Sequence, residues 1–511
     1  MAGAAVVQDE NLMSRFGLES NLVDRAVYDR ALAHLAAAEI RLPTFAELAS
    51  PESLPASLTE ALVGVDPDAP DPLNLFRVHW FAAPNRRDRV EVPGHVVLPE
   101  ALTGVTAPIV VAFGDRFPMI HAHKVLAAYG CLAPKLVTGQ FDPTRQRAVW
   151  PSTGNYCRGG VAISKLLGCR GVAVLPEGMS RERFEWLERW VEQPDDVLAT
   201  AGSESNVKEI YDACHALAAD PSNTVLNQFC EFGNHLAHVT VTGPALECLA
   251  RSLQETRPDL RFAGFCSASG SAGTLGAGDW LKERLGCQVL VAEPLECPTL
   301  LSNGYGEHNI QGIGDKHVPL IHNVTNTDVV SGVSDRSTDQ LHVLFQSEVG
   351  RTFLADERGV PKEVIDSLEH FGLSAIANVL SAIQLAKRQK LSANDAILTV
   401  ATDGAALYAS EQERICARDF SSGFDEQQAA ICFEQHILGQ NDHHLRELDA
   451  AERDRIFNLG YFTWVEQQGV SLEDFERRRS QSFWQDLRAL VPAWDAAIVR
   501  FNEEASERLK P

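Results

Sequence analysis

A turn-like cluster of small polar residues precedes an apolar helical pattern in the segment WPSTGNYCRGGVAISKLLGC, residues 150–169. The first N–H groups of a helix have no partner inside the helix, so hydroxyls, an amide and a glycine placed there can bind an anion. The same residues also form an ordinary helix N-cap. The segment therefore predicts a helix start and leaves open whether it holds a ligand.

A second glycine-rich turn lies in CSASGSAGTLGAGDWLKERLG, residues 266–286, after a strand pattern and before a helical one. Backbone amides in such a turn can hold a phosphate. The turn lacks the GxGxxG spacing and the later acidic residue of a dinucleotide site, and it lacks the GK[ST] ending of a Walker loop. A phosphate cup and a tight strand-to-helix turn both remain possible.

Lys124 opens a helical pattern in FPMIHAHKVLAAYG, residues 117–130. Most lysines lie on a solvated face, but the neighbours here are apolar or small. A lysine in an apolar pocket has a lowered pKa and can form a Schiff base. His121 and His123 suggest a proton shuttle or a metal pair, yet two histidines at this spacing more often serve packing and a polar rim. No metal site is expected.

Three further segments carry reactive residue types. Cys157 follows Asn155 by two positions and is a weak candidate nucleophile. The adjacent histidines of NDHHLREL, residues 441–448, point apart on a helix and indicate a solvated face. The segment DDVLATAGSESNVKE, residues 195–209, is expected to be a mobile edge near the cleft and not a catalytic loop.

The bulk composition excludes several classes of protein. The chain has 511 residues, 45% of them hydrophobic and 22% charged, and a formal net charge of −24. Such an acidic surface repels nucleic acid and anionic membranes, and no run approaches the roughly 20 apolar residues that span a bilayer. Eleven cysteines without a CxxC pair indicate reduced thiols, and the first residues lack a leader pattern. We expect a cytoplasmic protein.

Short apolar strand patterns alternate with helical patterns from about residue 90 to 410. Buried strands separated by helices imply parallel sheets covered on both faces, so the fold class is α/β. The N-terminal and C-terminal segments show only helical patterns. Expected strands are 107–113, 171–176, 223–229, 261–268, 287–293 and 396–402; expected helices are 124–133, 180–192, 206–219, 243–255, 278–286 and 378–389.

Six segments in order resemble the fold-type II pyridoxal-phosphate enzymes, the group of cysteine synthase, cystathionine β-synthase, threonine dehydratase and the tryptophan synthase β-chain. The resemblance covers residues 93–410 and is strongest toward cysteine synthases. The six segments are PSTGN (151–155), NQFCEFGNHLAHVTVTGPALE (227–247), GSAGT (270–274), IQGIGDKHVP (310–319) with TDVVSGVSD after it, FGLSAIANVLSAI (371–383) and TVATDGAALYASE (399–411).

The resemblance implies pyridoxal 5′-phosphate as cofactor and assigns the site residues. Lys124 would bind the cofactor covalently and then remove the substrate Cα proton, and Asn155 would face the ring oxygen. Ser374 would meet the pyridine nitrogen. The phosphate would be held by Gly270, Ser271, Ala272, Gly273 and Thr274, and the substrate carboxylate by Ser152, Thr153, Gly154 and Gln228.

The departures from the cysteine-synthase pattern are specific. Lys124 lies in AHKVL, where a cysteine synthase has Gly-Ser-x-Lys-Asp-Arg, and this version is closer to the tryptophan synthase β-chain. Ser271 and Ala272 replace Thr and Gly of the phosphate loop. The two terminal extensions have no counterpart in a minimal cysteine synthase. An ordinary cysteine synthase is therefore not the expectation.

The resemblance implies β-replacement on serine, O-acetylserine or a similar amino acid through an aminoacrylate. β-Elimination by a lyase or dehydratase is the alternative, and an idle amino-acid-binding scaffold is a third hypothesis. The family and the commonest oligomer type suggest a homodimer that takes a small amino acid. The expected division is an N-terminal helical extension (1–90), a smaller mobile domain with the lysine (91–240), a larger domain with the phosphate loop (241–410) and a helical C-terminal extension (411–511).

Overall fold

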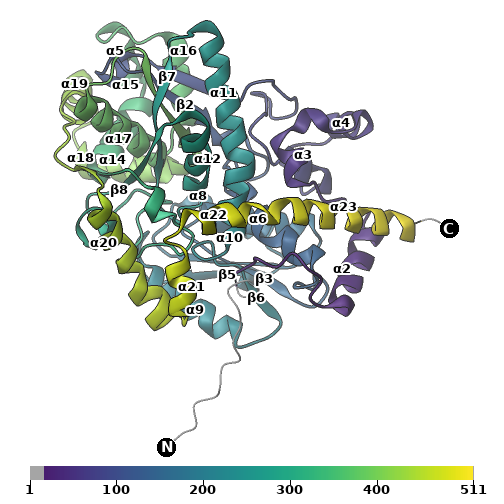
Figure 1. Cartoon of the computed structure of the whole chain (residues 1–511). Coiled ribbons are helices and arrows are strands. Elements are labelled where there is room, and N and C mark those ends of the chain that lie inside the picture. The colour runs from purple at the N-terminus through teal and green to yellow at the C-terminus, as the bar shows by residue number, and fades with distance from the viewer. Residues whose placement is uncertain (1–15, 510–511) are drawn as a thin grey trace, which may run out of the picture.

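Two β-sheets form the framework of the computed structural model, which describes residues 16–509. The larger sheet has seven strands in the order β1-β2-β10-β7-β8-β9-β11, and the smaller has four in the order β5-β4-β3-β6. Figure 1 shows the two sheets in separate halves of the molecule. The strands of the larger sheet are β1 (His95–Leu98), β2 (Ile109–Phe113), β7 (Arg261–Ala268), β8 (Gln288–Pro294), β9 (Val329–Val333), β10 (Asp395–Ala401) and β11 (Leu445–Glu447).

The five central strands of the larger sheet are parallel and buried on both faces. Alternate residues of β7 and β8 belong to two different core clusters, so each face packs on its own helix layer. One layer contains α11 (Gly243–Thr256) and α12 (Leu275–Leu285), and the other contains α14 (Asp335–Gln346) and α17 (Leu373–Gln389). The expected α/β class with helix-covered parallel sheets is confirmed.

The smaller sheet is entirely parallel and follows the same rule. Ala148 and Trp150 of β3 join the core cluster on the side of α7, while Val149 joins the cluster on the side of α9. The elements of this half are β3 (Arg147–Pro151), β4 (Gly171–Pro176), β5 (Val197–Thr200), β6 (Asn223–Val225), α7 (Asn155–Leu166), α8 (Arg181–Trp190) and α9 (Val207–Ala218).

The expected segment boundary is wrong for the first two strands of the 91–240 segment. β1 and β2 belong to the larger sheet, because β2 pairs in parallel with β10 and places Ile109 opposite Ile397. Local patterns identify a buried strand but carry no information on a partner so distant in the chain. The small sheet lies within the expected 91–240 range, and the division into two domains otherwise stays a prediction.

The helix that begins at Lys124 is buried along almost its whole length. In α6 (Lys124–Val137) each residue after Lys124 is buried. It crosses α10 (Phe232–Ala237) so closely that a Cβ on Gly130 would lie 2.7 Å from the carbonyl oxygen of Gly233. On its other side, Gly159 of α7 leaves room for the backbone at Lys124. Glycines thus bring three helices together around the lysine.

The two terminal extensions pack on each other and on α6. In Figure 1 the C-terminal helix α23 (Leu490–Arg508) crosses beside α2 (Arg25–Ala37) and α3 (Phe45–Ala49). The expected all-helical C-terminal extension is wrong in one detail, because β11 adds an antiparallel edge strand to β9. The described residues contain no helix that could cross a membrane. The other helices of eight or more residues are α4 (Ala56–Val63), α15 (Glu348–Asp356), α18 (Ala409–Asp419), α19 (Glu426–Phe433), α20 (Ala450–Tyr461) and α22 (Gln481–Arg488).

Candidate functional site

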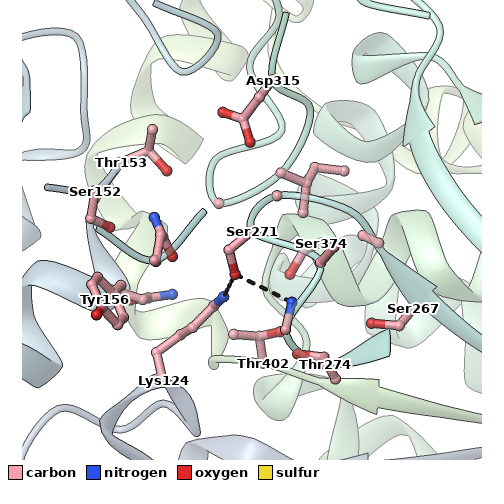
Figure 2. Close-up of a pocket in the computed structure, with 18 of the residues that line it drawn as sticks. Lys124, Ser152, Thr153, Tyr156, Ser267, Ser271, Thr274, Asp315, Ser374 and Thr402 are labelled. Carbon is pink, nitrogen blue, oxygen red and sulfur yellow. Dashed lines mark hydrogen bonds between the residues drawn. The ribbon is translucent and has the colours of Figure 1, made fainter. Parts of the chain in front are cut away.

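A cavity between the two halves brings the predicted site residues together. Figure 2 shows Lys124, Ser152 and Thr153 from the smaller half opposite Ser271, Thr274 and Ser374 from the larger half. Gly154 does not line the cavity. The predicted residues that do are Lys124, Ser152, Thr153, Asn155, Gln228, Gly270, Ser271, Ala272, Gly273, Thr274 and Ser374.

Lys124 extends into this cavity from the first residue of α6. Its Nζ donates a hydrogen bond to Ser271 Oγ at 3.0 Å, as Figure 2 shows. Burial lowers the pKa of Lys124 to about 8, while nearby carboxylates, Asp315 foremost, oppose the shift. At neutral pH about a tenth of the amine is therefore unprotonated, far more than for an ordinary lysine, and nucleophilic attack and proton removal both require that form.

The loop at residues 270–274 offers unused amides at the start of α12. Among the described residues, the amides of residues 270–272 and of Thr274 donate to no protein acceptor. Ala272 has a φ of 64°, a left-handed conformation that lets successive amides point to one side. A Cβ on Gly273 would lie 2.1 Å from Asn234 Oδ1, so this position needs glycine. The geometry favours the phosphate cup over a plain turn.

The PSTGN segment forms the tight turn before α7. Ser152 Oγ accepts a hydrogen bond from the amide of Gly154 at 3.0 Å. Gly154 has a φ of 140°, and a Cβ there would lie 2.5 Å from Cδ of Arg183. Gly154 therefore shapes the turn and makes room for an arginine behind it, and only Ser152 and Thr153 of the turn face the cavity.

A buried cluster of charges lies behind this turn. Asn155 donates from Nδ2 to Asp403 Oδ2 at 2.6 Å and accepts at Oδ1 from Arg158 at 3.1 Å. Asp403 also lies 3.5 Å from Arg183, and both side chains are essentially inaccessible. Two guanidinium groups face one carboxylate, so the cluster carries a net positive charge next to the turn. That charge favours an anionic ligand group.

Sequence reasoning missed the carboxylates around the cavity. Asp315 lines it, and burial raises the pKa of Asp315 to about 7. Glu204 adjoins it, and burial raises the pKa of Glu204 well above its usual range. Glu204 lies in the segment 195–209 that was expected to be a mobile edge: β5 is indeed an edge strand, but Glu204 and Ser205 are buried. The position of Asp315 directly after the GIG motif was the available signal.

The weaker candidates have structural explanations. His123 is buried, burial lowers its pKa to about 3, and Nε2 lies 3.1 Å from Thr274 Oγ1, so its packing role is confirmed. Burial raises the pKa of the Cys157 thiol to about 12, which makes it a poor nucleophile. The expected helix at the histidine pair is wrong, because residues 442–444 form a turn before β11. No metal-binding cluster exists in the described part of the chain.

Three curated proteins with similar sequences are cysteine synthases. Cysteine synthase B of Campylobacter jejuni is 32% identical over 256 residues, which are 49% of this chain and 75% of that protein. Cysteine synthase 3 of Caenorhabditis elegans is 26% identical and covers 51% of this chain and 70% of its own length. Cysteine synthase of Staphylococcus aureus is 27% identical over a stretch that covers 49% of this chain and 72% of that protein. No model of a known protein family matches the chain.

Solved structures share the fold. A hydrogen sulfide-producing enzyme of Fusobacterium nucleatum matches with a TM-score of 0.50 and 21% identity, covering 63% of this chain and 87% of that one. An O-acetylserine-dependent cystathionine β-synthase of Helicobacter pylori matches with a TM-score of 0.50 and 20% identity, covering 62% of this chain and 94% of that one. A variant of O-ureido-L-serine synthase matches with a TM-score of 0.52 and 19% identity, covering 66% of this chain and 95% of that one. The chain belongs to the cysteine synthase family and has the fold of the fold-type II pyridoxal-phosphate enzymes.

Proposed function

We propose that the protein catalyses β-replacement on a serine-type amino acid with pyridoxal 5′-phosphate as its cofactor. The residues present fit this group: the amine of Lys124 for its aldehyde, the unused amides of the 270–274 loop for its phosphate, and Ser374 for its ring nitrogen. When bound, the cofactor supplies an electron sink for the substrate Cα. The observation that carries the proposal is the lysine with its lowered pKa opposite a loop of free amides.

The chain's own residues bind and orient the substrate. Ser152, Thr153 and Gln228 line one side of the cavity and supply donors for an α-carboxylate. The net positive charge of the cluster behind them attracts that carboxylate. Asn155 is held in place from behind by Asp403, which leaves its second amide hydrogen for a ligand oxygen.

Lys124 then moves the proton. Its amine, with a pKa near 8, is suited to remove a proton from the substrate Cα at neutral pH. Ser271 Oγ, 3.0 Å from Nζ, holds the amine when it is not engaged. The neutral hydroxyl of Ser374 at the ring nitrogen favours loss of the β-substituent over long-lived charge storage on the ring. The homodimer and the cytosolic location stay predictions.

The test is a visible absorption spectrum of the purified protein beside Lys124→Ala and the control Lys208→Ala, whose side chain is exposed on α9. We expect a cofactor band in the wild type and the control that Lys124→Ala lacks, and a change of that band with L-serine or O-acetyl-L-serine. Consumption of the new species by sulfide, thiols or amines indicates a synthase, and release of keto acid and ammonia indicates a lyase. A wild-type protein that gains no band from added pyridoxal phosphate would refute the proposal.

A further inference from the structure

Two buried carboxylates, Asp315 and Glu204, lie at or beside the cavity and interact through their charges. Asp315 is 6% exposed and Glu204 is 1% exposed. Within the described residues, Oδ2 of Asp315 accepts no hydrogen bond. Figure 2 shows the Asp315 carboxylate directed toward Thr153 and Ser271. Buried acids are almost always paired, so an acid with an unpaired oxygen that lines a substrate cavity requires a function.

The groups around the two acids do not neutralise both of them. Asp315 faces Lys124, and its charge also reaches Tyr211 and Cys297. Burial raises the pKa of Glu204, and hydrogen bonds from Thr153 and the amide of Gly312, with the charge of Arg183, oppose this shift. Arg183 already serves Asp403 at 3.5 Å.

Two carboxylates that share a low-dielectric site with few counter-charges resist ionising together. Burial raises the pKa of Asp315 to about 7, and the charge of Asp315 further raises the pKa of Glu204. Each acid therefore keeps its proton to a higher pH than an ordinary carboxyl group, so the pair can donate a proton near neutral pH. Because Asp315 lines the cavity and Glu204 does not, the proton reaches a ligand through Asp315.

We propose that Asp315 is the acid and base that acts at the β-substituent of the substrate, and that Glu204 is a positioning residue that keeps one proton on the pair. The inference rests on the function proposed above. It assigns the substrate class: an amino acid whose leaving group needs a proton, such as the hydroxyl of serine or a thiol, in place of an activated ester.

The proton balance closes over one turnover. When the Cβ–O bond of serine breaks, its electron pair stays on oxygen, and the proton of Asp315 converts the leaving hydroxide into water. The acceptor H–X then forms an X–Cβ bond and returns its proton to Asp315. Nothing is oxidised or reduced. Acetate, a weak base, leaves without this proton, so an O-acetyl substrate does not need Asp315.

The C-terminal extension holds the segment that carries Asp315. Trp464 Nε1 donates to the carbonyl of Val318 at 2.7 Å, and Arg478 donates to that of Leu320 at 2.8 Å. On the other side, Thr299 Oγ1 donates to the carbonyl of Asp315 at 2.9 Å. A carboxylate that must reach a substrate atom needs such support, since misplacement by about 1 Å costs about 100-fold in rate.

The test compares L-serine with O-acetyl-L-serine in the holoenzyme of Asp315→Asn, Glu204→Gln and the control Asp366→Asn, an exposed residue of α16 (Lys362–Ser367). Rapid mixing measures the rate at which each substrate changes the cofactor band. We expect Asp315→Asn to slow L-serine about 100-fold or more and O-acetyl-L-serine less than about 10-fold. Glu204→Gln should move the pH profile with L-serine to lower pH, because it removes a like charge from Asp315.

A second readout does not depend on turnover. In cofactor-free protein at neutral pH, infrared difference spectra of wild type minus Glu204→Gln should contain the C=O stretch of a protonated carboxylic acid. Equal slowing of both substrates by Asp315→Asn, or of neither, would overturn the inference, as would absence of that stretch. If Asp315→Asn folds poorly, Asp315→Glu provides a second test, because a glutamate keeps the acid and should retain activity with L-serine. A wild-type protein inactive on both substrates would instead refute the proposed function.

Discussion

The close crossing of α6 and α10 makes Gly130→Ala a sharp test of how the site is built. The added Cβ would lie 2.7 Å from the carbonyl oxygen of Gly233 and 2.8 Å from Cβ of Ala237. An ordinary carbon–oxygen contact is about 3.3 Å, so the helices must separate by about 0.6 Å. Overpacking of this kind costs about 1–3 kcal/mol. The better helix propensity of alanine offsets up to about 1 kcal/mol, and the full offset leaves a net loss of up to about 2 kcal/mol.

Separating α6 from α10 should also disturb the site, because each helix supplies one hydrogen-bond donor to Ser271. Lys124 of α6 and Asn234 of α10 both donate to Ser271 Oγ at 3.0 Å. We therefore expect Gly130→Ala to lower the free energy of unfolding in urea and to weaken cofactor retention in the same samples. Gly64→Ala is the control: its φ is −78°, and its Cβ would lie 4.0 Å from the nearest atom. A Gly130→Ala protein as stable as this control would refute the reasoning.

Three further substitutions test other contacts. Ala272→Gly should stabilise the protein by up to about 1 kcal/mol and tighten phosphate binding, because Ala272 has a φ of 64° that favours glycine; weaker cofactor retention would contradict this. Asp315→Asn should stabilise the cofactor-free protein. The pKa of Asp315 is about 7 in the folded protein and 3.8 for an ordinary aspartate, so the free energy of unfolding of the wild type falls as the pH rises between these values. The advantage of the variant over the wild type therefore grows until about pH 7. If the variant and the wild type differed by the same urea midpoint at pH 4 and at pH 8, ionisation of Asp315 would not cost folding free energy. Trp464→Phe should lower the free energy of unfolding by about 1 kcal/mol, because it leaves the carbonyl of Val318 without its donor at 2.7 Å. It should also slow turnover of L-serine more than turnover of O-acetyl-L-serine. If the ratio of the two rates stayed unchanged, Trp464 would not help to position Asp315.

The sequence predicted the elements that have strong local patterns. The strand patterns at 107–113 and 261–268 and the helical pattern from Lys124 were recognised because apolar runs and apolar periodicity are visible within a few residues. The pairing of β2 with β10 was not, since nothing in Ile109–Phe113 specifies a partner almost three hundred residues later. The three-residue β11 has too short a pattern to detect.

The same limit applies to the site. Loops that contact a ligand carry recognisable composition, so Ser152, Ser271 and Ser374 were assigned from the sequence, and the structure places them around one cavity. Glu204 stands among serines and an asparagine, and Asp315 stands before a lysine and a histidine, so both resemble surface residues. Their burial depends on segments far away in the chain, and no local pattern reports it.

The placement of the terminal extensions follows from what they contact. Asp495 of α23 accepts hydrogen bonds from the amides of Phe45 and Ala46 at the start of α3, and Phe45 packs on Tyr129 of α6. The N-terminal extension and α23 therefore support the helix that begins at Lys124.

The rest of the C-terminal extension supports the opposite side of the site. Beyond the bond from Trp464 to Val318, residues 463–468 form one wall of a cavity of about 590 Å³ whose other wall is α9. Ser205 and Lys316, which line this cavity, directly follow Glu204 and Asp315 in the chain. The extension and α9 therefore enclose space beside the two segments that carry the buried carboxylates, so the extension supports these segments from outside the site.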